Sequence, residues 1–253
     1  MKICFLGINY GTSYLIKEWH QSVVDLNCDA QFYIVDNYST EQERYDVIGL
    51  CNELGIHLIK LENIGYGSAL NKAFSIIQGH FEDCDFAIMG GNLDIRFLNF
   101  PVNLNPGNYV YVPQAIENNR NKNPFLTKFQ SRFLKLYKLA IILNSPFILK
   151  IIIALFKVLK FFPSKMWALH GSLFCFHSSV LSKTKIFNEK SFLYCEELDF
   201  ACYVEKISKS SFLTTDIKYE HFRNAATSKI LKTSGSFFKI WKPSFINWLQ
   251  RWK

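Results

Sequence analysis

The sequence predicts an α/β fold with a mostly parallel central sheet flanked by helices. Short apolar runs alternate with helix-length amphipathic stretches over the first 112 of its 253 residues. Strands separated by helices at this spacing are typical of a two-sided parallel sheet. A chain of this length can bury the full core that such a sheet requires. After residue 117 the pattern changes to basic, apolar, helix-length stretches, which predict a helical insertion.

The apolar runs give the expected strands in order. Those of the first half are residues 3–8, 32–35, 56–61, 86–89 and 109–112. A second block follows the insertion, with a strand at 172–177, a helix at 196–206 and a strand at 212–215. Parallel sheets bind ligands beyond the carboxyl ends of their strands, so the residues directly after each run are the first candidates for a site.

Composition limits the class of partner. The chain has 29 basic and 21 acidic residues, a net charge of +8, which favours nucleotides, nucleic acid or anionic lipid. No nucleic-acid-binding motif accompanies this charge, so we expect no nucleic-acid partner. The seven cysteines are scattered and include no Cys-x-x-Cys pair, and residues 1–8 do not form a signal peptide. These features predict a cytoplasmic protein with reduced thiols.

Polar residues follow the first two expected strands. Asn9 follows the first, and Asp36 and Asn37 follow the second. A carboxylate at Asp36 can accept hydrogen bonds from a base N–H or a ribose hydroxyl. An ordinary turn or helix cap is the alternative for Asp-Asn-x-Ser.

A glycine-containing segment follows the third expected strand. Asn63, Gly65, Tyr66 and Gly67 come before a helix-like stretch that contains Asn71. Flexible backbone at a helix N-terminus suits a diphosphate or a sugar hydroxyl. The alternative is a simple glycine turn that enters a helix.

Asn92 and Asp94 follow the fourth expected strand. Oxygen ligands two residues apart can share a divalent cation that bridges a diphosphate. A single carboxylate provides few ligands for such a cation, and an ordinary turn after a strand is the alternative. His221 comes after the last strand-like run and could complete this site with Asp94, or be a packed or surface residue.

Glu196, Glu197 and Asp199 place three carboxylates at the start of the expected helix. Favourable interaction with the helix dipole could account for them. Apolar residues on both sides instead indicate partly buried carboxylates, whose raised pKa suits a general base.

In order and spacing these motifs resemble family 2 glycosyltransferases of the GT-A fold, from about Ile3 to His221 without the insertion. The motifs are Asp-Asn-x-Ser, Asn-x-Gly-x-Gly with a later Asn, an x-x-Asp strand end, a glycine-led strand at 171–176, Phe-x-Tyr-x-Glu-Glu-x-Asp and a final His. The closest resemblance is to bacterial rhamnosyl- and galactofuranosyl-transferase-like members that build surface polysaccharides.

The resemblance implies a role for each motif. Asp36 would contact the base of a nucleotide-sugar donor, residues 63–67 would line the donor site, and Asp94 and His221 would bind Mn²⁺ or Mg²⁺. Glu197 occupies the general-base position, Glu196 precedes it, and Asp199 would support the acceptor side or the helix start. Further candidates for donor contact are Asn9, Asn37, Asn71 and Asn92. Asn92 and Glu197 stand where the family commonly has aspartate.

The implied activity is inverting transfer of a sugar to a lipid-linked or growing polysaccharide of the O-antigen or capsule type. The alternative, motivated by Asn92, is a catalytically silent sugar-nucleotide-binding subunit that docks a partner transferase. We expect a catalytic domain at 1–222, with the insertion at about 118–165, and an amphipathic tail at 223–253.

The insertion and the tail predict peripheral association with the inner face of the cell membrane. On ideal helices Lys128, Arg132, Lys135 and Lys138 share one side, as do Lys150, Lys157 and Lys160. Trp241, Phe245, Trp248 and Trp252 share a face of the tail, which suits an anchor at headgroup level. The alternatives are helices that cover the domain's own core or pair in a homo-oligomer. The apolar runs are shorter than the roughly 20 residues of a membrane span.

Overall fold

The computed structural model describes residues 1–81, 84–101, 104, 106–107, 109–162, 164–182, 184–207, 211–222 and 234–252. The expected tail is therefore described over 234–252, and its residues 223–233 and 253 lie outside the described part.

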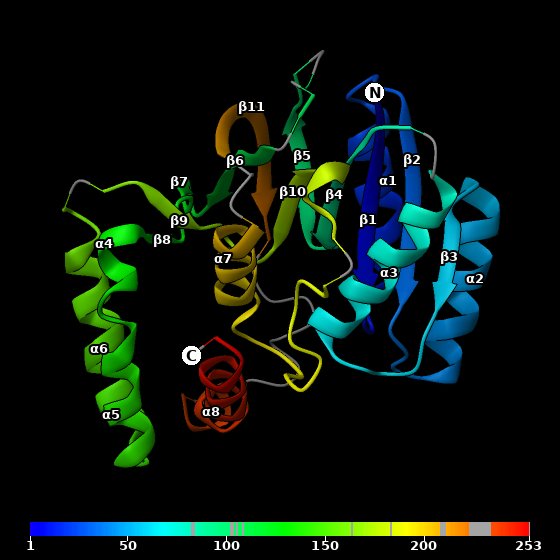
Figure 1. The fold of residues 1–253 in the computed structure, drawn as a ribbon. Coiled ribbons are helices and arrows are strands. Elements are labelled where there is room, and N and C mark those ends of the chain that lie inside the picture. Colours follow the sequence, from blue (N-terminus) through cyan, green and yellow to red (C-terminus); the bar gives the residue numbers. More distant parts are fainter. Residues whose placement is uncertain are drawn as a thin grey trace.

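Helices and strands alternate along the first half of the chain (Figure 1). The strands are β1 (Lys2–Asn9), β2 (Ala30–Asp36), β3 (His57–Lys60), β4 (Phe86–Asn92), β5 (Ile95–Asn99), β6 (Tyr109–Glu117), β7 (Arg120–Asn121), β8 (Leu126–Thr127), β9 (Met166–Ala168), β10 (Leu173–His177) and β11 (Ser211–His221). The α-helices are α1 (Ile16–Val24), α2 (Glu41–Leu54), α3 (Tyr66–His80), α4 (Lys128–Ser131), α5 (Tyr137–Ile142), α6 (Pro146–Leu159), α7 (Glu196–Ile207) and α8 (Ser234–Arg251). Short 3-10 helices cover Ser13–Leu15, Leu134–Leu136 and Ser178–Val180.

The central sheet has the strand order β3-β2-β1-β4-β10-β6-β11-β5. The first four of these strands are parallel, and β6 and β11 form a second parallel pair. Strand β10 lies antiparallel between β4 and β6, and its start lies beside the carboxyl end of β4. This arrangement confirms the predicted α/β fold and brings the ends of distant strands to one edge.

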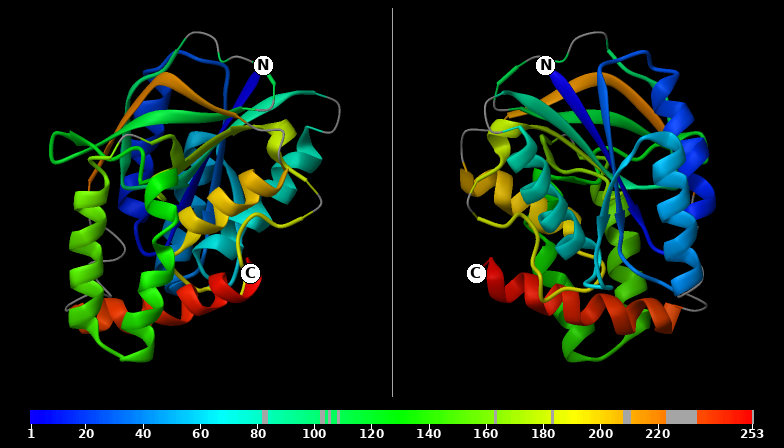
Figure 2. Two further views of the ribbon diagram at one scale, coloured as in Figure 1. Left: turned by 60° about the vertical axis from the view of Figure 1, so that its left-hand side comes forward. Right: turned by 90° about the vertical axis from the view of Figure 1, so that its right-hand side faces the viewer.

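The sheet is covered on both faces because its strands alternate between two cores. In β1, Cys4, Leu6 and Ile8 face the core beneath α3 and α7. Ile3 and Phe5 face the opposite core, beneath α1 and α2. Figure 2 shows the sheet between these helices. Strand β5 was not predicted, and β11 is longer than expected and ends on His221.

A third core joins the insertion, α8 and the outer face of α7. Trp241, Phe245 and Trp248 are buried in it, with exposures of 8%, 0% and 8%. The ring of Tyr137 packs at 5.4 Å from both Trp241 and Phe245. The expected tail helix is present, but its interpretation as a headgroup-level anchor is wrong, because its aromatic face packs against the protein itself.

The first basic stretch of the insertion is not one helix. Helix α4 ends at Ser131, and a 3-10 turn at Leu134–Leu136 precedes α5. The expected alignment of its four cations on one face therefore does not hold. The second stretch does form one helix, since the Ser145 side chain caps α6 and Pro146 stands at its first turn. No helix within the described ranges is long and apolar enough to cross a bilayer.

Candidate active site

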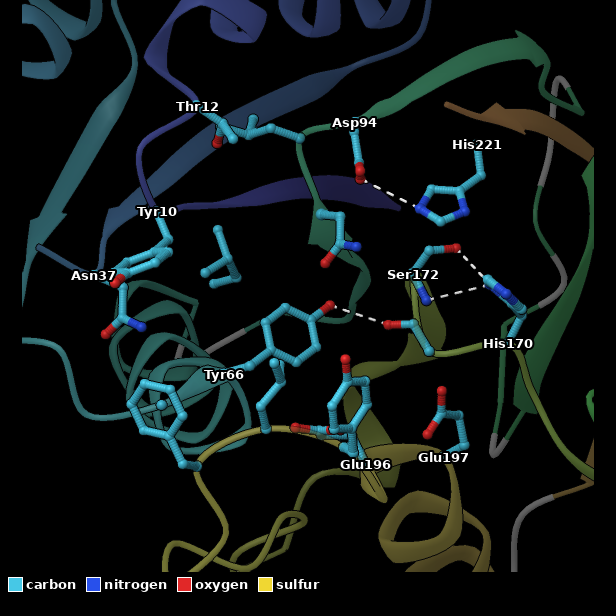
Figure 3. A pocket seen from close by; sticks show the side chains of 18 of the residues that line it. Tyr10, Thr12, Asn37, Tyr66, Asp94, His170, Ser172, Glu196, Glu197 and His221 are labelled. Carbon is cyan, nitrogen blue, oxygen red and sulfur yellow. Dashed lines mark hydrogen bonds and ion pairs between the residues drawn. The ribbon is translucent and has the colours of Figure 1, made fainter. Parts of the chain in front are cut away.

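A cleft of about 510 Å³ opens at the edge of the sheet where β1 and β4 end and β10 begins. Its volume is in the range of pockets for small ligands. The start of α3 and the segment before α7 form its other walls (Figure 3). Nine of the fourteen predicted site residues line the cleft: Asn37, Asn63, Gly65, Tyr66, Asn92, Asp94, Glu196, Glu197 and His221. The other five are Asn9, Asp36, Gly67, Asn71 and Asp199.

The two glutamates stand at the first turn of α7, after a backbone turn of unusual conformation. Tyr194 and Cys195 have φ angles of +74° and +73°, in the left-handed region that non-glycine residues rarely adopt. The Tyr194 ring packs edge-on against Phe237 of α8, with centroids 4.9 Å apart. Helix α8 therefore supports the segment that aims the glutamates into the cleft.

Glu197 is held against Gly171. The Gly171 N–H donates to its carboxylate, and a Cβ atom on Gly171 would lie 2.4 Å from Glu197 Oε1. On the opposite side of the same residue, the Tyr66 hydroxyl donates to the Gly171 carbonyl at 3.1 Å (Figure 3). The Gly171 backbone therefore links the start of α3 to Glu197.

Burial raises the pKa of both glutamates. The rise is larger for Glu196, because burial and the charge of Glu197 act on it together. The pKa of Glu197 also rises through burial, but hydrogen bonds from its own backbone and from Gly171 oppose the rise. The pair therefore binds its first proton on Glu196 and leaves Glu197 as the carboxylate, the form that a base requires.

For the transfer reaction that the motifs imply, Gly171→Ala is expected to lower kcat by about 10- to 100-fold with a smaller change in KM, because an added methyl displaces the Glu197 carboxylate. Steady-state kinetics on the purified variant measure this split. Gly49→Ala is the matched control, since a Cβ at that helical position meets nothing within 4 Å. The control is expected to keep kcat and to gain about 0.5–1 kcal/mol of unfolding free energy. Equal kcat in both variants would contradict the positioning role of Gly171.

Asp94 and His221 meet although 127 positions separate them. Strand β11 pairs antiparallel with β5, which begins one residue after Asp94, and this pairing brings His221 Nε2 to 3.3 Å from Asp94 Oδ1. Buried Glu117 stands on the far side of the imidazole, with Oε1 3.7 Å from Nδ1. A carboxylate behind a ligating histidine orients its ring and favours the tautomer that binds metal.

These residues fit a divalent cation that is shared with a ligand. A separation of 3.3 Å is close to the roughly 3 Å between adjacent ligands of an ion with bonds of about 2.1 Å. Within the described ranges, no three His, Cys, Asp or Glu side chains gather as a complete metal site. A cation here would therefore take further ligands from a diphosphate and water, as Mg²⁺ commonly does.

Sequence reasoning missed Glu117 and His170. His170 lines the cleft beside His221, with ring centroids 5.4 Å apart, and burial lowers its pKa to about 4. Its Nδ1 is 2.8 Å from Ser172 Oγ, which lies 2.9 Å from the buried Tyr219 hydroxyl. Two features of the sequence could have identified them: Glu117 follows an apolar strand, and His170 directly precedes Gly171.

Asp36 and Asn9 lie behind the cleft, outside its lining. Asp36 has no exposed surface and pairs with Arg44, Nε to Oδ2 at 2.7 Å. Asn9 donates to the other carboxylate oxygen at 3.4 Å and accepts from the Thr12 backbone N–H at 3.0 Å. The expected contact between Asp36 and a base is not available in this conformation, because the Arg44 pair covers the carboxylate.

Asn71 and Gly67 also serve packing. The Asn71 side chain donates to the Phe187 carbonyl at 2.9 Å and accepts from the Phe187 N–H at 3.0 Å. A Cβ atom on Gly67 would lie 2.9 Å from the Phe187 side chain. These residues join α3 to the loop before α7, and neither of them lines the cleft.

Asp199 does not line the cleft. It lies in the first turn of α7, and its oxygens accept from the Asn188 N–H at 2.8 Å and from Trp252 Nε1 at 2.6 Å. Arg251 Nη1 lies 3.7 Å away. These contacts fit the prediction that Asp199 supports the start of the helix. Its carboxylate also attaches the residue after α8 to α7.

Known structures resemble this chain in fold. TarS of S. aureus, a glycosyltransferase, superposes with a TM-score of 0.53 at 15% identity, over 95% of this chain and 38% of that one. A structure of its residues 1–349 gives 0.52 at 15% identity, over 87% and 60%. The chain has the GT-A fold. It spans less than two thirds of either structure, and at this identity the likeness shows the fold alone. No family model matches the sequence, and no curated protein matches it.

Proposed function

We propose that this chain is an inverting glycosyltransferase that moves a sugar from a nucleotide-sugar donor to a saccharide acceptor. One observation carries the proposal: in a GT-A fold, the Glu197 carboxylate and the Asp94–His221 pair line the same cleft. The first is a candidate base and the second a candidate cation site. Inverting transfer needs these two functions and no covalent nucleophile.

Glu197 would accept the proton of the attacking acceptor hydroxyl. The Gly171 N–H orients its carboxylate, and Glu196, whose pKa is raised further, takes the first proton that the pair binds. The Tyr66 phenol keeps its proton, because burial holds its pKa well above the usual range. It remains a donor to Gly171 and keeps that segment in place.

The donor diphosphate would lie near Asp94 and His221, which would hold Mn²⁺ or Mg²⁺. The cation would neutralise the charge that develops on the leaving diphosphate. Asn92, at the end of β4, adds an amide where the family commonly has a carboxylate. Asn37 and Asn63 line the same cleft and hydrogen-bond at 3.5 Å, so their remaining polar groups could bind ribose or sugar hydroxyls.

The acceptor we propose is a lipid-linked or growing surface polysaccharide, of the O-antigen or capsule type, at the inner face of the cell membrane. The resemblance of the motifs to rhamnosyl- and galactofuranosyl-transferase-like enzymes supports this choice and suggests a hexosyl or rhamnosyl donor. Apolar residues of the cleft wall, including Phe192, Leu193 and Phe237, provide surface for a sugar ring face or a lipid link.

Turnover of nucleotide sugars by the purified chain tests the proposal. A donor panel is first screened by thermal shift, because a ligand that binds the folded state raises the melting temperature by mass action. The donor that binds is then offered with Mn²⁺ and a lipid-linked acceptor. We expect product with an inverted anomeric centre and loss of turnover on chelation by EDTA.

Each outcome bears on the choice between an enzyme and a silent subunit. A donor that binds without turnover, with a panel of lipid-linked acceptors and Mn²⁺, would favour the catalytically silent subunit. Failure of every donor to bind would contradict both. Full turnover in EDTA would contradict the cation site while leaving the transfer intact.

A further inference from the structure

The excess positive charge of the protein is confined to the insertion. Residues 118–165 contain ten basic and no acidic residues, which leaves 19 basic and 21 acidic residues in the rest of the chain. Lys135, Lys150 and Lys157 are exposed, and no described carboxylate lies within 4 Å of their ammonium groups. These cations are free to meet an external anionic partner.

The same segment exposes most of the large apolar side chains found at the described surface. Ten of nineteen such side chains lie between Leu136 and Phe162. The most exposed are Phe161 at 87%, Ile142 at 77% and Phe147 at 71%. An apolar surface of this density on a soluble domain marks an interaction site.

Helix α6 has two distinct apolar faces. Leu149, Ile152 and Phe156 are buried in the third core and fix the helix to the protein. The exposed apolar side chains of Phe147, Ile151, Leu155 and Val158 form a second stripe, within an arc of roughly 80° at 100° per residue. Lys150 and Lys157 lie beside it. The core accounts for one face only, and the outer face is left without a partner among the described residues.

We infer that the outer face of α5 and α6, from Leu136 to Phe162, docks the protein on a bilayer that contains anionic lipid. Figure 2 shows the two helices side by side at one edge of the molecule, and the side chains of their outer face are exposed. Helix α6 has 14 residues and so is about 21 Å long, too short to cross the roughly 30 Å hydrocarbon core. It would lie flat in the interface, with apolar side chains inserted and lysines at the phosphates.

Charge favours a bilayer over a second copy of this chain. A two-fold interface through this face would bring equal clusters of lysine toward each other with no acidic residue of the insertion between them. Juxtaposed like charges oppose association, whereas anionic headgroups neutralise them. The inference deepens the proposed function, on which the choice of a lipid surface partly rests, and it replaces the tail anchor that the sequence suggested.

Vesicle flotation of the full chain tests this inference without any sugar chemistry. The vesicles consist of phosphatidylcholine, with and without phosphatidylglycerol. We expect binding that requires phosphatidylglycerol and weakens with salt. Lys150→Gln/Lys157→Gln is expected to lower binding about 30-fold, at roughly fivefold for each lysine. Phe147→Ser/Phe161→Ser is expected to lower it more than about tenfold by removing inserted apolar area.

The control replaces two exposed apolar residues outside the insertion, Tyr45→Ser/Leu98→Ser, at 67% and 46% exposure. It is expected to bind vesicles as the unmodified chain does. Absence of binding by the unmodified chain, or binding that neither double variant reduces, would overturn the inference. So would a concentration-dependent dimer in light scattering that Phe147→Ser/Phe161→Ser converts to monomer, because a second copy would then cover the face.

Failure of this inference and failure of the proposed function give different results. The two double variants are expected to bind the donor in the thermal-shift assay as the unmodified chain does, and to transfer sugar to a water-soluble acceptor analogue at an unchanged rate. Vesicle binding with no turnover would contradict the transferase alone. Turnover with no vesicle binding would contradict the docking face alone.

Discussion

Replacing Glu197 by glutamine is expected to lower kcat/KM by about 10²- to 10⁴-fold, the usual contribution of a positioned general base. Glutamine keeps the shape and can still accept the Gly171 N–H, but it cannot take a proton from the acceptor hydroxyl. Donor affinity should change little, because the donor side of the cleft retains Asn37, Asn63, Asp94 and His221. Initial rates and a donor-binding isotherm separate the two effects.

Glu196→Gln is the matched control for this variant. It is expected to keep kcat/KM within about tenfold, since Glu196 holds the shared proton and is not the base. Loss of activity in Glu196→Gln with retention in Glu197→Gln would reverse the assignment.

The pH profile of transfer by the unmodified chain tests the same assignment. A base acts when deprotonated, and burial raises the pKa of Glu197, so kcat/KM should rise with pH through a value above the roughly 4.3 of an ordinary glutamate. Glu197→Gln should lack this acid limb.

Phe245→Ala is expected to lower the free energy of unfolding by about 3–5 kcal/mol, as for other phenylalanines removed from a core. Phe245 lies on the face of α8 that packs against the insertion and is fully buried. The ring centroids of Trp241 and Trp248 lie 4.9 and 5.2 Å from its own. The cavity left behind would loosen α8, which also supports the turn before the two glutamates. Urea unfolding monitored by circular dichroism measures the change.

Phe147→Ala on α6 is the matched control, because this phenylalanine is 71% exposed. Its effect in vesicle-free buffer is expected to stay within about 0.5 kcal/mol. Similar losses in the two variants would contradict the docking of α8 on the insertion.

Local sequence patterns predicted the parallel half of the fold well. Runs such as Ile3–Ile8 and Phe86–Met89 are buried on both faces, and a continuous apolar run is the signal of such a strand. Strand β5 was missed because it is short and includes Arg96 and Asn99, so its pattern is weak. The insertion was predicted as helical, but its short strands β7 and β8 form by pairing with β6 and with β9, which follows the insertion. These pairings and the break after α4 depend on contacts with distant segments.

The tail shows what a periodic pattern leaves open. Spacing identified a helix with Trp241, Phe245 and Trp248 on one face, and this helix is present. The pattern could not distinguish a bilayer from the protein's own core, because both bury the same apolar side chains. Polar contacts with the rest of the protein hold this helix against the core. Asp199 accepts a hydrogen bond from Trp252, and Ser244 donates to the Leu193 carbonyl at 2.6 Å.

The sequence predicted where the candidate site lies, at the ends of the strands, better than it predicted the role of each residue there. Asp94 and His221 were proposed together, and the pairing of β5 with β11 brings them into contact. Asp36 and Asn71 have the same residue types as ligand-binding side chains, but their partners, Arg44 and Phe187, commit them to structure. A side chain's type fixes which hydrogen bonds it can make, whereas the fold decides which partner it meets.

The segregation of charge between the insertion and the rest of the chain makes the molecule an electric dipole. The insertion carries ten basic and no acidic residues, and the remainder of the chain carries a slight negative excess. Their field extends over a Debye length of about 8–10 Å at moderate ionic strength. Near any polyanionic surface the protein would experience a torque before contact that turns α5 and α6 toward it. Salt would therefore control the orientation of arrival as well as the strength of attachment.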